Sequence, residues 1–346
     1  MAGRTESLWV ATSYFNPAGY RRRLANFRAF RRNLAAPLLV VELARPGRHE
    51  LADGDGDIVI RLEGEDRIWQ KERLVNLAIA RLPISARHVA WMDCDLIFGD
   101  PDWPAKAVRH LGERGGLLQL FARSVHLPPS LDPASVTLDD CRAAKPIVTG
   151  VAIARAVAAA AFDRNEEKLV QARKAVGAPS YYPILDKHNC YGMAWAARRD
   201  AIAQVGLYDR NVIGGADSLQ VFAALSRLDD YWRLRASAAA HKRDIAQWAE
   251  AARATGLFDR LAALDGDVYH LWHGEFAHRD YRGRHETLAR RDFDPARDIA
   301  LDANGAWRWT DPDGPLAAEV EAYFFARRED GAQGMRAEDA TADRKS

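Results

Sequence analysis

A short apolar run that ends in two acidic residues constrains this chain more than any other stretch. Residues 88–98 read HVAWMDCDLIF, so that the run leads directly into Asp93, Cys94 and Asp95. Its length suits one buried strand, and alternate residues of an extended chain point to one side. We therefore expect Asp93 and Asp95 to present their oxygens together, which would suit Mg²⁺ or Mn²⁺ and the phosphates that such ions bring. The plain alternative is a strand followed by an Asp-rich turn.

The sequence before this segment alternates between strand-like and helix-like patterns. Apolar runs at 8–12, 38–43 and 58–62 predict strands, and amphipathic spacing at 19–33 and 69–79 predicts helices. Such alternation predicts an α/β sandwich with a mostly parallel sheet. Glu42 lies near the carboxyl end of the second run, where open α/β sheets bind ligands.

A second acidic residue follows a glycine pair later in the chain. A loop-rich stretch at 124–146 and a helix at about 151–176 are expected first, and residues 189–199 then form a strand with Gly192 inside it. Gly214-Gly215-Ala216-Asp217 leads into a helix at 219–228. Asp217 suits the N-cap of that helix, and a catalytic acid at the same position is compatible with that role.

Two histidines, His270 and His273, lie three residues apart in the stretch YHLWHG. A neutral imidazole from this stretch would complete the metal coordination that Asp95 begins, and core packing is the alternative. Tyr191, Trp195 and Trp272 are candidates to stack on a ring of a ligand, with core packing again as the alternative.

Composition narrows the functional class and the compartment. Lys and Arg total 49 against 48 Asp and Glu, a net charge of +1, so no global positive field points to nucleic acid. Three widely spaced cysteines favour a reducing compartment. No hydrophobic signal core is seen near the start and the apolar run at 151–162 is too short for a membrane span, which predicts a cytoplasmic protein without an integral membrane segment.

With these residues in hand, the chain resembles the GT-A-fold glycosyltransferases that use nucleotide-sugar donors, in particular family-two-like and galactosyltransferase-like groups. The resemblance implies a GT-A-type, Rossmann-like α/β/α sandwich with a mostly parallel central sheet and a helical C-terminal part. It implies a donor-binding half at 1–123 and an acceptor-binding and catalytic half at 124–328. The polar stretch 329–346 is expected to be a disordered tail.

The resemblance also implies roles for single residues. Asp93-Cys94-Asp95 is similar to the D-x-D motif, with Asp95 as metal ligand and Asp93 on the ribose or the metal. His273 is the first choice, and His270 the second, to complete a Mn²⁺ or Mg²⁺ site. Asp217 resembles the catalytic base of inverting members, beside Gly192 and Gly215 in the acceptor and sugar site. The residues implied in donor binding, for which a UDP-sugar is favoured, are Thr12, Tyr14, Asn16, Glu42, Lys71, Arg73 and Asn76.

Three sequence segments make the resemblance more specific. They are WQKERLVNLAI, WMDCDLIF and HLWHG, and R-x-Y-x-x-R follows the last of them at 279–284. These segments are similar to those of bacterial and phage relatives of the enzyme that glucosylates hydroxymethyluracil in kinetoplastid DNA. The acceptor hydroxyl would then belong to a glycan, a small molecule, a protein or a hydroxymethylated pyrimidine in DNA. A nucleotidyltransferase and a non-catalytic sugar- or nucleic-acid-binding module are the alternatives from other classes.

Overall fold

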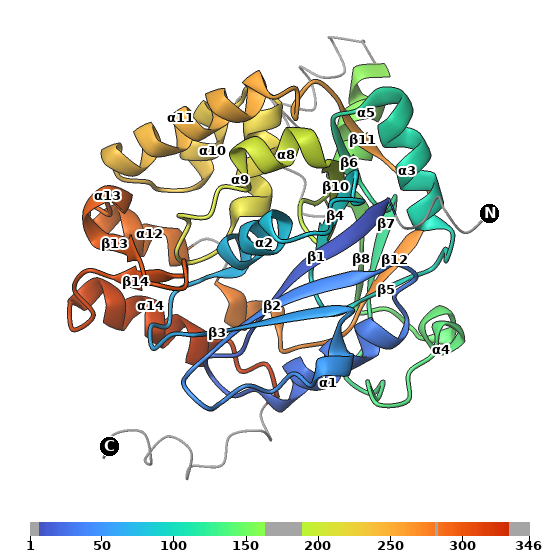
Figure 1. Cartoon of the computed structure of the whole chain (residues 1–346), viewed down its shortest axis with the longest axis horizontal. Coiled ribbons are helices and arrows are strands. Elements are labelled where there is room, and N and C mark those ends of the chain that lie inside the picture. Colours follow the sequence, from blue (N-terminus) through green and yellow to red (C-terminus); the bar gives the residue numbers. More distant parts are fainter. Residues whose placement is uncertain (1–6, 163–188, 281–282, 332–346) are drawn as a thin grey trace.

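A seven-stranded sheet forms the centre of the protein, in a computed structural model that describes residues 7–162, 189–280 and 283–331 (Figure 1). The strand order is β3-β2-β1-β4-β10-β6-β11, and only β10 runs antiparallel to its neighbours. The strands are β1 Leu8–Phe15, β2 Leu38–Ala44, β3 Ile58–Glu63, β4 His88–Met92, β6 Leu117–Gln119, β10 Ala194–Arg198 and β11 Leu261–Ala263. The predicted α/β/α sandwich with a mostly parallel central sheet is confirmed.

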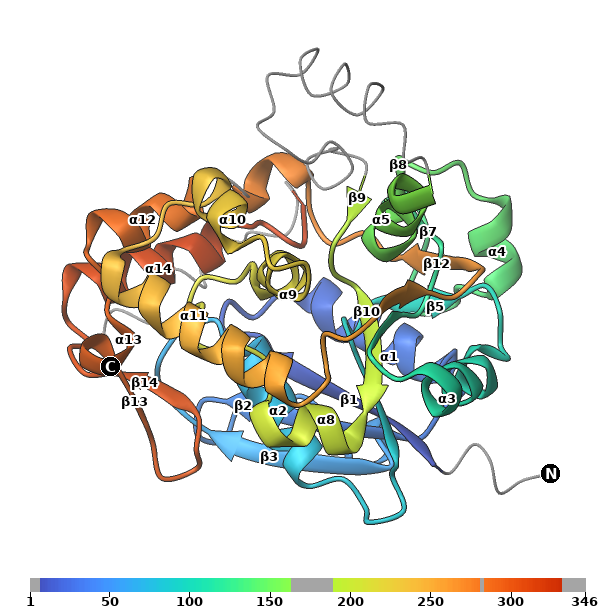
Figure 2. The ribbon, with the colours of Figure 1, turned by 90° about the horizontal axis from the view of Figure 1, so that it is seen from above.

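Helices cover both faces of this sheet because the apolar runs of its strands are buried on both sides. Side chains of α2, α8, α9 and α11 share one hydrophobic cluster with the sheet, and α1 and α3 share another with its opposite face (Figure 2). These helices are α1 Arg21–Arg32, α2 Lys71–Ala80, α3 Trp103–Arg114, α8 Arg199–Val205, α9 Ala216–Ala224 and α11 Ala239–Ala254. Thr12 is also fully buried, and its hydroxyl donates to the carbonyl of Met92 at 2.7 Å.

A smaller sheet brings two distant parts of the chain together. Its order is β5-β12-β7-β8-β9, with β5 Leu96–Phe98, β7 Arg123–His126, β8 Val148–Ala152, β9 Asn189–Cys190 and β12 Asp267–His270. Strand β12 pairs antiparallel with β5, so His270 lies opposite Leu96, and Leu271 donates its backbone N–H to the carbonyl of Asp95 at 2.9 Å. This register places the histidine stretch directly beside the acidic turn that follows β4.

The C-terminal part is mainly helical, as predicted. It holds α10 Leu228–Leu234, α12 Arg284–Arg290, α13 Pro295–Asp298 and α14 Pro315–Ala326, with a hairpin of β13 Ile299–Leu301 and β14 Trp307–Trp309. Two further helices, α4 Leu138–Ala143 and α5 Ile153–Phe162, lie in the middle of the chain. None of the described helices combines the length and the hydrophobicity that a membrane span requires.

Several predicted boundaries differ from the structure. The predicted helix at 151–176 begins at Ile153, because Val148–Ala152 pairs into the small sheet, and its continuation lies outside the described residues. The predicted strand at 189–199 is two strands, which separate at Tyr191–Met193, where Met193 has a φ of 74°. Glu329 is 1% exposed, so the folded part extends past the predicted tail boundary, while 332–346 is outside the described residues.

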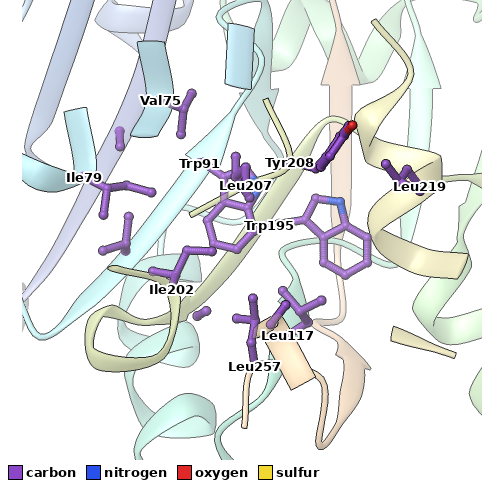
Figure 3. Packing of buried hydrophobic residues seen from close by; sticks show 14 of the residues in the cluster. Val75, Ile79, Trp91, Leu117, Trp195, Ile202, Leu207, Tyr208, Leu219 and Leu257 are labelled. Atoms are coloured by element: carbon purple, nitrogen blue, oxygen red, sulfur yellow. The ribbon is translucent and has the colours of Figure 1, made fainter. Parts of the chain in front are cut away.

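Trp195 belongs to the core. It pairs directly with Trp91 across β10 and β4, and its indole N–H donates to the carbonyl of Tyr191 at 2.9 Å. Figure 3 shows both indoles in the cluster that also contains Leu117 and Leu207. This packing gives Trp195 a structural role in place of the stacking role considered from the sequence.

Replacing Trp195 by alanine should therefore cost about 3–5 kcal/mol of unfolding free energy, because a large cavity would open in a packed interior. Chemical denaturation measures this loss. The control is Ile84→Ala, since the Ile84 side chain is 93% exposed; its unfolding free energy should change by less than about 0.5 kcal/mol. A Trp195→Ala protein as stable as the control would contradict the packing described here.

Candidate active site

A cavity of about 770 Å³ lies where strands β1 and β4 end. This position, outside the carboxyl ends of parallel strands, is where open α/β sheets bind ligands. Its wall combines residues from the ends of those strands with the first turns of α2 and α9 and with the loop after β12. Both halves of the predicted donor–acceptor division therefore contribute to one cavity.

Lys71 joins two acidic residues from separate elements in this cavity. Its Nζ lies 2.6 Å from Oδ1 of Asp93, after β4, and 3.1 Å from Oδ2 of Asp217, in the first turn of α9. Burial alone would lower the pKa of Lys71, but Asp217 and Asp93 together raise it well above its usual value. Burial raises the pKa of Asp93 to about 6, although Lys71 opposes this shift. Lys71 is thus a fixed positive charge between two carboxylates.

The turn before α9 directs Asp217 into the cavity. Gly215 is the N-cap of α9 with a φ of +93°, a left-handed conformation that favours glycine, and Asp217 lies in the first turn. Its carboxylate lies against the backbone of Gly192: a Cβ at position 192 would lie 2.8 Å from Oδ2 of Asp217. Gly192 therefore makes room for the acid, and Asp217 does not occupy the N-cap position that the sequence suggested.

Asp95 lies beside two histidines. Its Oδ2 lies 3.1 Å from Nε2 of His273, and its Oδ1 lies 3.7 Å from Nε2 of His270. The two Nε2 atoms are 3.2 Å apart, and one ligand atom from each of the three residues fits within a span of 4.8 Å. Among the described residues the possible metal cluster contains Asp95 and not Asp93, whose Oδ1 pairs with Lys71, so that a joint presentation of the Asp93 and Asp95 oxygens stays a prediction.

The donor set of Asp95, His270 and His273 fits a divalent cation. Burial lowers the pKa of His270 well below its usual value and also lowers that of His273, so both imidazoles keep a lone pair for a metal. Oδ1 of Asp95 is buried and has no hydrogen-bond partner among the described residues. Imidazole nitrogens with one carboxylate suit Mn²⁺ or another transition ion. Both His270 and His273 lie at this place, whereas His273 was the first choice and His270 the second from the sequence.

Ten of the sequence-predicted site residues line the cavity. They are Thr12, Lys71, Asp93, Asp95, Tyr191, Gly192, Gly215, Asp217, His270 and His273. Tyr191 stacks on Phe222 with an interplanar angle of 9°. The chain thus gathers into one place residues that are spread over more than 260 positions of the sequence.

The other seven lie outside the cavity wall and hold the fold together. Tyr14 and Asn16 both donate to Glu50, and Glu42 accepts from the backbone of Glu50 at 2.6 Å. Arg73 pairs with Asp209 at 3.3 Å. The remaining three are Asn76, which bonds both backbone groups of Leu207, Trp195 in the core, and Trp272, over which the Arg22 guanidinium lies.

Sequence reasoning missed several residues of the cavity wall. Glu72 and Glu329 line it, as do the guanidinium-bearing Arg23 and Arg327. Glu72 stands in the amphipathic pattern of α2, where its position suggested an ordinary helix residue. Glu329 stands in a polar stretch without periodicity, so no local signal marked it as buried.

The buried Glu72 makes folding stability depend on pH. Burial raises the pKa of Glu72 from 4.5 to about 7, and Asp217 adds to the rise that Lys71 opposes. The folded state therefore binds the proton more tightly, so this group's stabilising contribution is complete below pH 4.5 and is lost as pH rises through about 7.

Glu72→Gln should remove this dependence because an amide does not titrate. Its oxygen can still accept from the Trp69 indole N–H, whose Nε1 lies 3.1 Å from Oε2 of Glu72. Melting temperatures of the variant and the wild type should coincide near pH 4.5, with the variant higher above pH 8. The exposed Glu250→Gln is the control and should leave the pH profile unchanged. A Glu72→Gln profile parallel to that of the wild type would contradict this assignment.

No known family model matches this chain, and no curated protein matches it. Solved structures of S. aureus TarS align with it at low similarity. The structure of TarS 1–349 is 11% identical over 94% of this chain and 73% of that chain, with a TM-score of 0.38, and its complex with UDP has a TM-score of 0.37. In another TarS structure the alignment spans 32% of that chain, with a TM-score of 0.33. A likeness this weak carries no argument, so the activity of this chain has to follow from its own residues.

Proposed function

We propose that this protein is a metal-dependent glycosyltransferase that moves a sugar from a nucleoside-diphosphate sugar, a UDP-sugar being favoured, to an acceptor hydroxyl. The observation that carries the proposal is the union, in one cavity, of the Asp95–His270–His273 donor set with a second carboxylate, Asp217, beside Lys71. Transfer from a diphosphate needs a cation for the leaving group and a base for the acceptor, and the cavity offers groups for both.

The residues that would hold the metal are Asp95, His270 and His273. A bound Mn²⁺ or Mg²⁺ would supply Lewis-acid stabilisation for the departing nucleoside diphosphate. The chain adds positive charge of its own at this place: Nη2 of Arg279 lies 3.2 Å from Nε2 of His273, and Lys71 stands beside Asp93. These cations would orient the diphosphate and offset the charge that builds up on it.

Asp217 would act as the general base of an inverting transfer. Its side chain is 30% exposed and lines the cavity, and its carboxylate lies against Lys71 and the backbone of Gly192. In this role Asp217 accepts the proton of the acceptor hydroxyl while the oxygen attacks the anomeric carbon. Asp93 would act on the donor through Lys71 or would contact the ribose of the donor directly. Tyr191 would stack on the sugar.

The acceptor class is left to experiment. The arginine-rich segments 21–32 and 279–297 could follow a DNA backbone or be ordinary surface. In the structure Arg31 pairs with Asp57 at 3.1 Å and Arg22 donates to the Leu131 carbonyl at 2.9 Å. Arg291 donates to Glu319 at 3.0 Å. These contacts stabilise the protein's own fold, so hydroxymethylated DNA is one acceptor to test among glycans, proteins and small molecules.

The direct test incubates the protein and Mn²⁺ with a panel of nucleotide sugars, with and without hydroxymethylated DNA. Release of nucleoside diphosphate that requires the metal is the expected result, and a rise with one acceptor would identify its class. Pyrophosphate release from a nucleoside triphosphate and a sugar phosphate would instead indicate a nucleotidyltransferase. Absence of turnover of every nucleotide sugar would favour a binding module.

Two variants separate the proposed roles of the acids. Asp95→Asn should abolish metal-dependent release of nucleoside diphosphate, because the donor set loses its anionic ligand. Asp217→Asn should keep nucleotide affinity, measured by calorimetry, and lose about 10²–10⁴-fold in transfer rate, because it removes the base.

Lys106→Met is a matched control, since Lys106 pairs with Asp100 outside the cavity wall. Its transfer rate should equal that of the wild type. Full transfer by Asp95→Asn, or weakened nucleotide binding with intact transfer in Asp217→Asn, would overturn the assigned roles.

A further inference from the structure

The segment after α14 returns to the cavity and is bound there at several points. We call residues 327–331 the C-terminal strap. Asp330 accepts from the backbone N–H groups of Arg21 and Arg22, at 3.1 and 2.7 Å, and so caps the start of α1. The backbone N–H of Arg328 donates to the Tyr20 hydroxyl at 3.0 Å. These contacts fix the strap against the first helix of the chain.

Glu329 lines the cavity wall, as does Arg327 of the same strap. Its carboxylate accepts from Nε of Arg23 at 3.0 Å, and its Oε1 lies 2.5 Å from Nη2 of Arg23 and 2.7 Å from Nε of Arg327. Burial would raise the pKa of Glu329, but Arg23 and Arg327 hold it well below its usual value. Glu329 is therefore a buried anion between two guanidinium groups.

The same carboxylate lies behind the proposed metal ligands. Oε1 of Glu329 is 3.9 Å from Nδ1 of His273, whose Nε2 faces Asp95 at 3.1 Å. Arg279 lies on the same imidazole. Arg23, Arg279 and Arg327 thus line the cavity that holds the site proposed for a cation, and like charges in a buried, weakly screened site repel strongly. Glu329 is the carboxylate that offsets Arg23 and Arg327 there.

We propose that Glu329 is a positioning residue of the metal site. It balances Arg23 and Arg327 so that the Asp95–His270–His273 set keeps its affinity for a divalent cation. Its Oε1 lies 3.9 Å from Nδ1 of His273, beyond hydrogen-bond distance, and at that distance its negative charge favours a proton on Nδ1, which leaves Nε2 free for the metal. The inference rests on the proposed metal-dependent function and adds to it a residue outside the donor set.

Two variants of one ion pair test this inference with full-length protein. Glu329→Gln leaves both arginines without their anion, so the Kd for Mn²⁺ alone, measured by calorimetry without nucleotide, should rise about tenfold or more. Arg327→Met breaks the same ion pair but removes a positive charge, so its Kd for Mn²⁺ should stay equal to that of the wild type or fall. If the pair only anchored the strap, both variants would weaken Mn²⁺ binding alike.

Equal weakening in both variants, or unchanged binding in Glu329→Gln, would overturn the inference. If Glu329→Gln does not fold, Arg327→Met decides alone: weaker Mn²⁺ binding contradicts the charge balance, and equal or tighter binding supports it. Asp330→Asn is the control for a loosened strap, and its Kd should stay within about twofold, because outer partners act only through the ligand they touch. Failure of the wild type to bind Mn²⁺ would instead refute the metal-dependent function itself.

Discussion

Compensation of buried charge is the constraint on which the rest of this structure depends. Lys71, Asp93 and Asp217 are all partly enclosed, and each would be costly inside the protein without the others. The same holds for Glu329 between Arg23 and Arg327. Because Lys71, Asp93 and Asp217 come from three different elements, and Arg23 of α1 pairs with Glu329 of the strap, the cavity depends on the sheet, α1, α2, α9 and the strap together.

The smaller sheet brings the two histidines to this cavity. A mostly parallel sheet delivers acids at its carboxyl edge, but the histidines arrive from β12, far along the chain. The antiparallel pairing of β12 with β5 joins the two, since β5 begins one residue after Asp95. The smaller sheet pairs with the residues that follow the acidic turn of the main sheet. This pairing places His270 and His273 beside Asp95 and so brings the three possible metal ligands together.

Local pattern predicted what lies at strand ends and failed where tertiary contacts decide. The apolar run 88–92 and the D-C-D turn predicted both the strand and the cavity acids. Glu42 stands at a strand end too, yet it bonds the backbone of residues 50 and 51, because the loop after β2 folds over it. No periodic pattern marked Glu329, because the contact with Arg23 that encloses it joins residues 306 positions apart in the sequence.

That long separation has a consequence for how the protein is made. The first helix, α1, has its amino end capped by Asp330, and Arg23 of this helix is neutralised by Glu329. Chains emerge from the ribosome with the N-terminal part first, and contacts between distant residues form late. A nascent chain can therefore pair most of its sheet strands while Arg23 still lacks its partner Glu329. The cavity wall is complete only after the strap has been synthesised.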